Sequence, residues 1–138
     1  PMRIIGPRSW SERILAADRR QLAGMPWVYT SENCPFYELT QTFFGDDADD
    51  MRKVAYVDSE DAVRELIRAE AGLSLLRADD AARLEAEGLA VCWPGSSPAI
   101  GLGFAVHAQR QAEPVIRALL DVVTEAWPEA ETPRTAAL

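Results

Sequence analysis

The residues best suited to chemistry lie in one short stretch, Tyr29–Tyr37, which brings hydroxyl groups, a thiol and a proline together. Thr30 and Ser31 follow an apolar run there, and Cys34 and Pro35 precede a segment with helical spacing. A loop between the end of a strand and the first turn of a helix offers unpaired N–H groups, and the helix dipole attracts anions to it. Two interpretations are open: a binding site for a polar or anionic ligand, or a plain helix cap in which Thr30 or Ser31 bonds locally.

Other motif-like features do not match known catalytic or metal sites. The acidic segment Asp46–Asp50 lacks the glycine and the closing glutamate of an EF-hand calcium loop. Gly101-Leu102-Gly103 lacks the third glycine of a dinucleotide-binding loop and falls in a predicted strand. His107 is the single histidine, and no GxSxG motif supplies a nucleophilic serine. We therefore expect a binding domain without catalytic activity, metal or cofactor.

Composition and charge narrow the choice of partners. The chain has 138 residues, of which 48% are hydrophobic, as in an ordinary soluble domain. It carries 22 Asp+Glu against 14 Lys+Arg, a formal net charge of −8. Such a surface repels phosphate backbones and anionic lipids, so we expect no direct contact with DNA or membranes.

The sequence also lacks targeting features. No apolar run reaches the roughly 18 residues of a transmembrane helix, and the first residues do not form a signal peptide. Cys34 and Cys92 are not spaced as a metal-binding pair. We expect a cytoplasmic protein with reduced thiols, a disulfide between these two cysteines being the alternative.

Short apolar runs alternate with segments of helical spacing, which predicts an α/β fold: a mixed, mostly parallel sheet with helices on both faces. The predicted strands are Met2–Gly6, Trp27–Thr30, Arg52–Val57, Gly72–Arg77, Leu89–Trp93 and Ile100–Val106. The predicted helices lie within 11–22, from Pro35 to a stop at Gly45, from a cap at Asp58 or Ser59 through Ile67, over 79–87 and over 113–127.

Several of these segments, taken in order, resemble a known family. Leu22–Val28 reads LAGMPWV and precedes a polar turn and a Cys-Pro-aromatic helix start at Cys34. Val57–Glu60 opens a helix, and Arg68–Arg77 reads RAEAGLSLLR. Over about residues 1–127 this succession resembles the effector-binding domain of LysR-type transcriptional regulators. Two positions depart from that pattern, since Glu70 stands where the family has a glycine and residue 77, an arginine, where it has a proline.

The resemblance implies a domain organisation. Effector domains of this family have two α/β lobes like those of type II periplasmic binding proteins, with a small molecule in the cleft between them. Residues 1–106 would form the second lobe, and residues 107–127 a return segment and a helix that packs on the first lobe. Residues 128–138 would be a flexible tail. The DNA-binding helix-turn-helix and most of the first lobe would lie upstream.

The resemblance also implies site residues. The effector-contacting residues carried over from the family are Thr30, Ser31, Cys34, Pro35 and Phe36. We predict that Arg77 adds selectivity, because a guanidinium suits an effector carboxylate. The alternative for Arg77 is an ion pair with Asp79 or Asp80. Peroxide-sensing members have a cysteine at the position of Cys34, but their resolving cysteine would fall near Phe43, so we do not expect that disulfide mechanism.

The segments 52–57 and 59–70 resemble the dimer-forming surface of the family. The implied interface residues are Val57, Ala62, Val63 and Leu66, and we expect a homodimer or tetramer. The predicted function is a small-molecule effector-binding regulatory domain for a small anionic or polar effector, with DNA bound only through another domain. One alternative is a lobe of a periplasmic solute-binding protein. Another is a small α/β enzyme with Cys34 as nucleophile and His107 as base.

Overall fold

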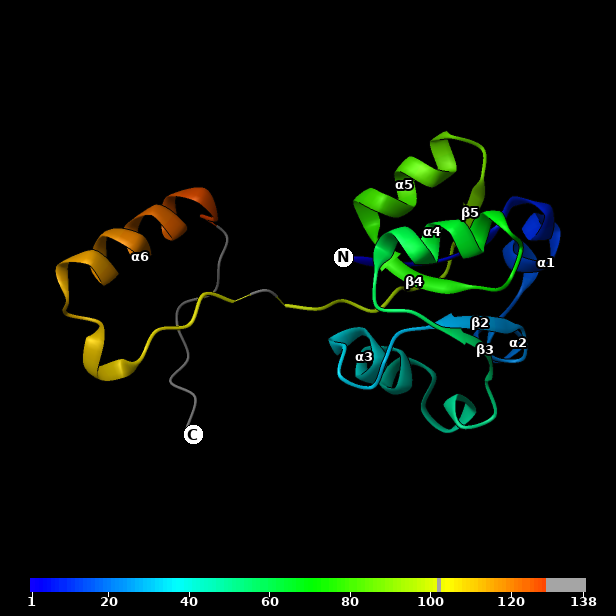
Figure 1. Ribbon diagram of the computed structural model, residues 1–138, viewed down its shortest axis with the longest axis horizontal. Coiled ribbons are helices and arrows are strands. Elements are labelled where there is room, and N and C mark those ends of the chain that lie inside the picture. The colour runs from blue at the N-terminus through cyan, green and yellow to red at the C-terminus, as the bar shows by residue number, and fades with distance from the viewer. Residues whose placement is uncertain (102, 129–138) are drawn as a thin grey trace. The chain divides into compact units, whose positions relative to one another are not determined.

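The computed structural model describes residues 1–101 and 103–128 and divides into two compact units, Pro1–Ile100 and Gly101–Leu138 (Figure 1). Among the described residues, the first unit holds all the strands and most of the helices. Within the described residues, no helix has the length and apolar character needed to cross a bilayer.

The strands of the first unit form a mixed arrangement. β1 (Met2–Pro7) lies between β4 (Ser74–Arg77) and β5 (Ala90–Cys92) and is antiparallel to both. β2 (Pro26–Tyr29) pairs in parallel with β3 (Arg52–Tyr56). A parallel bridge from Trp27 to Leu73 joins β2 to the β4 segment. The α/β class and the mixed sheet are confirmed, but the sheet is not mostly parallel, because β1 runs against both of its neighbours.

Helix ends follow the predicted signals. The α-helices are α1 (Ser11–Ala16), α2 (Arg19–Ala23), α3 (Pro35–Phe44), α4 (Glu60–Arg68), α5 (Ala78–Ala86) and α6 (Pro114–Ala126), with 3₁₀ turns η1 (Arg8–Trp10), η2 (Gly45–Ala48) and η3 (Ala108–Arg110). Pro35 occupies the first turn of α3, where a missing N–H costs nothing. Gly45 ends that helix at φ 58°. The Ser59 hydroxyl caps α4 by accepting the Ala62 N–H at 3.2 Å.

Alternate strand residues supply two apolar clusters on opposite faces of the sheet. Trp27 and Tyr29 belong to the cluster that includes Phe44 of α3. Val28 belongs to the other cluster, with Ile67 of α4 and further residues of α5. Helices therefore cover both faces, as predicted, and the loop after β2 emerges between them.

Glu70 adopts the left-handed conformation just after α4, at φ 58°. This is the conformation for which glycine is favoured, and a side chain there costs about 1–2 kcal/mol. Glu70→Gly is therefore expected to raise the free energy of unfolding by about 0.5–1 kcal/mol after the greater chain entropy of glycine is subtracted. Urea denaturation measures the difference. Glu70→Ala is the control, because alanine keeps the strain; an equal gain in both variants would contradict the explanation.

The second unit contains one long helix and no strand among its described residues. The strand predicted over Ile100–Val106 does not form at residues 100, 101 and 103–106, and residue 102 lies outside the described part. A strand needs a neighbouring strand to pair its N–H and C=O groups, and residues 101 and 103–128 of this unit provide none. The helix predicted over 113–127 is confirmed as α6. Of the tail predicted over 128–138, all but Pro128 lies outside the described residues.

Candidate functional site

The loop between β2 and α3 begins after a buried strand and ends at an N-cap residue whose side chain makes no capping hydrogen bond. Tyr29, at the end of β2, is 3% exposed, and Cys34 in extended conformation precedes Pro35. The Cys34 N–H donates to the Ser31 carbonyl at 2.9 Å, which closes a turn. The side chain of Cys34 makes no capping bond, and neither do the hydroxyls of Thr30 and Ser31 within the described residues. The plain-cap interpretation is therefore not what the structure shows, and the loop keeps polar groups available.

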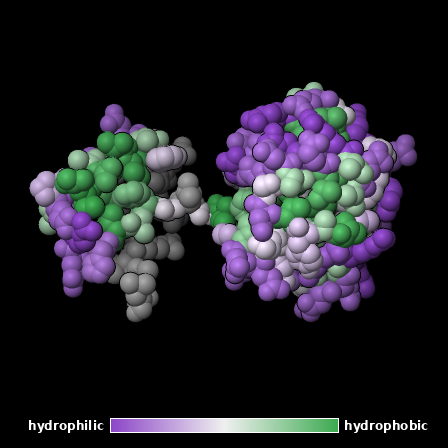
Figure 2. Space-filling model, in the orientation of Figure 1, coloured by the Kyte–Doolittle hydropathy of each residue, from purple (hydrophilic) through white to green (hydrophobic). Residues whose placement is uncertain are grey.

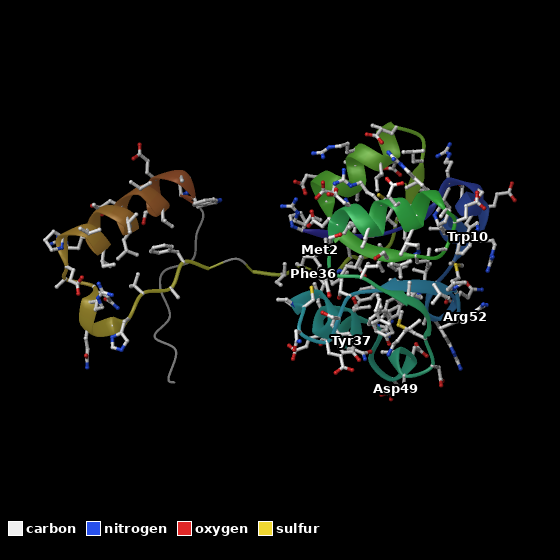
Figure 3. All side chains as sticks on the ribbon, in the orientation of Figure 1. Met2, Trp10, Phe36, Tyr37, Asp49 and Arg52 are labelled. Atoms are coloured by element: carbon white, nitrogen blue, oxygen red, sulfur yellow. The ribbon has the colours of Figure 1, made fainter. Side chains whose placement is uncertain are left out.

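A shallow hollow of about 10 Å³ opens beside this loop, with room for about one water molecule. It is lined by Trp27, Val28, Tyr29, Thr30, Phe36, Thr40, Ser74 and Leu75. The Thr40 hydroxyl donates to the Phe36 carbonyl at 2.7 Å, and the Ser74 hydroxyl donates to the Val28 carbonyl at 2.9 Å. The Tyr29 hydroxyl, which also belongs to a lining residue, donates to Oε1 of Gln41 at 3.4 Å. The hydroxyl protons of Thr40, Ser74 and Tyr29 are thus used, which leaves Thr30 as the lining hydroxyl best placed for a ligand. Figure 3 labels Phe36 and its neighbour Tyr37 on α3.

The carboxyl ends of β2, β3 and β4 are linked at one edge of the parallel part of the sheet. The Ser31 N–H, after β2, donates to Oδ1 of Asp58, after β3, at 3.3 Å. Two residues further, Glu60 reaches Arg77 at the end of β4, with 3.1 Å between Oε1 and Nε. In open α/β sheets, ligands bind outside such strand ends. The predicted residues Ser31 and Arg77 are thus connected through acidic residues of the β3–α4 turn.

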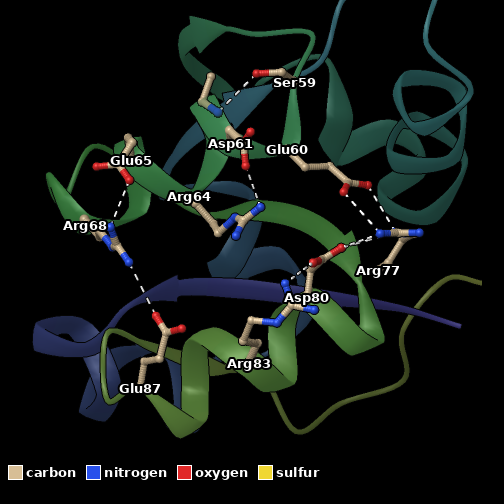
Figure 4. Close-up of polar contacts among 11 residues, drawn as sticks. Ser59, Glu60, Asp61, Arg64, Glu65, Arg68, Arg77, Asp80, Arg83 and Glu87 are labelled. Atoms are coloured by element: carbon tan, nitrogen blue, oxygen red, sulfur yellow. Dashed lines mark hydrogen bonds and ion pairs between the residues drawn. The ribbon is translucent and has the colours of Figure 1, made fainter.

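Arg77 is held by carboxylates of its own chain (Figure 4). Its Nη2 lies 2.7 Å from Oδ2 of Asp80, and Glu60 and Asp79 lie within 3.1 and 3.9 Å of its Nε. The hydrogen bond from Arg77 lowers the pKa of Asp80 below its ordinary value. Because Asp80 keeps only 5% of its side chain exposed, it requires this counter-charge. The alternative predicted for Arg77, pairing with Asp79 and Asp80, is what the structure shows.

The two cysteines have different surroundings. Both are free and partly buried. Burial, and then the neighbouring Glu85 carboxylate, raise the pKa of Cys92 to about 11. Glu85 also accepts the backbone N–H of Cys92 at 3.0 Å. Cys92 therefore remains a protonated thiol at neutral pH, which makes it a poor nucleophile.

The residues predicted for a partner surface divide between surface and core. Val57, Ala62 and Leu66 are half-buried, whereas Val63 is 3% exposed and packs in the cluster on the α4 face. Val63 is therefore not accessible to a partner, because its place in the helical pattern faces the sheet. Tyr56 of β3, which directly precedes Val57, is 57% exposed and is therefore accessible where Val63 is not.

Two of the features that the sequence analysis sets aside, the acidic segment 46–50 and His107, make local contacts in the structure. In the acidic segment 46–50, Asp47 pairs with Arg20 at 3.8 Å. Among the described residues, no group of three or more His, Cys, Asp or Glu side chains is placed to hold a metal ion. His107 lies in the second unit, where its Nδ1 accepts the Gln109 N–H at the start of η3.

Sequence reasoning did not identify Asp58 and Glu60 as contacts of the predicted site residues. The sequence predicts a helix cap at Asp58 or Ser59 and a second, weaker candidate for a ligand site at this pair, and the structure gives the cap to Ser59. Carboxylates that directly follow a strand predicted next to β2 are the signal that could have found them.

Comparisons with known proteins show the family and the fold of the chain. The sequence matches the family described as LysR substrate binding domain over residues 1–128. The comparison with curated proteins finds no match. Among solved structures, holo ArgBP from T. maritima is similar with a TM-score of 0.55 and 21% identity, over 91% of this chain and 57% of that one. The similarity shows a shared fold, and this chain covers just over half the length of that protein. With nearly its whole length matched, the chain belongs to the LysR substrate binding domain family.

Proposed function

We propose that this effector-binding regulatory domain recognises its small-molecule effector with the β2–α3 loop. The observation that supports this most is the position of the loop at the carboxyl ends of parallel strands, beside the hollow lined by Thr30 and Phe36. Ser31, Cys34 and Pro35 complete the loop. The effector is a small polar molecule, and Thr30 supplies a hydroxyl to it.

The helix of the second unit carries exposed apolar side chains. Val115 and Val122 of α6 are 69% and 61% exposed, and apolar residues gather over this helix (Figure 2). Free apolar surface of this kind marks an interaction site. In our proposal residues 1–106 act as the second lobe, and residues 107–127 pack on a first lobe that completes the cleft.

We propose further that the domain works as a homodimer or tetramer in the cytoplasm. The partner surface would include Val57, Ala62 and Leu66. Sedimentation equilibrium tests this proposal, and a monomer at every concentration would contradict it. DNA would be contacted through a separate helix-turn-helix domain, in keeping with the acidic charge of −8. The domain would have no catalysis of its own. A lobe of a periplasmic solute-binding protein is the less favoured alternative, supported by fold similarity alone.

Removal of the Thr30 hydroxyl tests the proposed site. Thr30→Val keeps the shape of the side chain and is expected to weaken effector binding roughly threefold to tenfold, the range for one hydrogen bond. Calorimetry would use the tightest binder from a panel of amino acids, carboxylates and aromatic acids. Thr42→Val, the same change at an exposed position of α3, is the control. Equal affinity of the Thr30 variant and the natural chain would contradict the site.

A further inference from the structure

Arginines join α4 to α5 at both ends of these helices (Figure 4). At one end, Arg77 lies 3.1 Å from Glu60 and 2.7 Å from Asp80. At the other end, Arg68 lies 2.9 Å from Glu65 and 3.4 Å from Glu87. Both ends use arginine–carboxylate pairs. Any difference in their effect on the effector loop must therefore come from their other contacts.

The Arg77 end is connected to the effector loop, and the Arg68 end is not connected by any described contact. Glu60 is the first residue of α4 and directly follows the turn that begins at Asp58. Asp58 accepts the Ser31 N–H at 3.3 Å, and the Val57 N–H donates to the Tyr29 carbonyl at 2.9 Å. The β3–α4 turn is thus attached on one side to the β2–α3 loop and on the other side to Arg77.

The burial of Asp80 explains why the guanidinium of Arg77 is held in place. The Asp80 carboxylate is 5% exposed, and Arg77 is its nearer partner at 2.7 Å, with Arg83 second at 3.5 Å. Loss of Arg77 would leave this buried carboxylate with the longer of its two ion pairs. Asp80 therefore fixes the guanidinium of Arg77. The planar fork of an arginine can hold two carboxylates at once, so Asp80 and Glu60 are fixed relative to each other.

We propose that Arg77 is a positioning residue of the effector site, which acts on Ser31 through Glu60 and Asp58 without contacting the effector. This deepens the proposed function and rests on it. The same turn begins α4, so a change at Ser31 reaches the helix that carries Ala62 and Leu66 of the proposed partner surface. Arg77 thereby links the effector loop to that surface through three consecutive residues, 58–60.

The test is the exchange of the Ser31 amide proton with water in the full chain, measured by NMR without any ligand. Glu60→Gln weakens the bond to Arg77, so we expect Ser31 exchange to accelerate roughly threefold to tenfold. Glu87→Gln is the matched control, because it weakens the same kind of pair at the other end of α4, and Ser31 exchange should not change. Arg77→Lys keeps the charge but loses the fork, and should give an intermediate acceleration.

Two results would overturn the proposal. One is an unchanged Ser31 amide in both Glu60→Gln and Arg77→Lys. The other is an equal acceleration in Glu87→Gln, which would mean that any loosening of α4 has this effect. The exchange of the buried Ile5 amide reports global unfolding in the same spectra. Because no effector is added, failure here would leave effector binding through Thr30 to be judged by its own experiment.

Discussion

Gly72→Ala is expected to lower the free energy of unfolding by about 3 kcal/mol, a large part of the 5–15 kcal/mol typical of a domain. A Cβ at this position would lie 2.7 Å from the carbonyl oxygen of Pro26 and 2.9 Å from its carbon. These are backbone atoms, which cannot rotate away as the end of a side chain can. The strands would have to separate, at the expense of the hydrogen bonds from Leu73 to Pro26 and from Val28 to Leu73, both 2.8 Å.

Urea denaturation measures this loss, and Gly24→Ala is the matched control. A Cβ at Gly24 would meet its nearest neighbour at 3.6 Å, which is ordinary contact. We expect the control to change the stability by less than about 0.5 kcal/mol. A similar small change in Gly72→Ala would contradict the close approach of Gly72 to the Pro26 carbonyl.

The thiol of Cys92 is expected to react with iodoacetamide about 100-fold more slowly at pH 8 than the same thiol in the unfolded chain. Burial and Glu85 raise its pKa to about 11, about two units above the ordinary value of a thiol, and the thiolate is the reactive form. Two pH units of difference in pKa correspond to a 100-fold difference in thiolate below pH 9. The rate in the folded chain should therefore rise about tenfold for each pH unit between pH 7 and 10.

Mass spectrometry of the Cys34→Ser variant follows Cys92 alone. The unfolded reference is the same variant in concentrated urea. A rate in the folded chain that levels off by pH 9 would contradict the effect of burial and of Glu85 on this thiol. Cys34→Ser leaves Cys92 untouched, because the two thiols are not bonded.

The fold was predictable where local chemistry decides the structure. Pro35 and Gly45 bound α3 as their backbone preferences require, and Ser59 caps α4. The local sequence of a strand does not tell which strands it pairs with, so the antiparallel pairing of β1 with both of its neighbours could not be predicted. The strand predicted from residue 100 has suitable side chains, but the described residues of the second unit contain no strand with which it could pair.

The candidate site was predictable in its loop but not in its charges. The loop from Thr30 follows from a strand that ends before a Pro-capped helix. The ion pairs of Arg77 depend on which strand ends meet in space, and only Asp79 and Asp80, its neighbours in sequence, could be named in advance. Glu60, 17 residues away, could not. Val63 shows a similar limit, because a helical stripe does not tell whether it faces the sheet or a partner.

The most direct test of effector binding by the β2–α3 loop is amide chemical-shift mapping during titration of the chain with the same panel of amino acids, carboxylates and aromatic acids. We predict that a binding compound shifts the amides of Thr30, Ser31, Cys34 and Phe36 most strongly, with smaller changes at Asp58. Binding that instead shifts residues distant from this loop, such as those of α2 or β5, and leaves the loop unchanged would contradict the account.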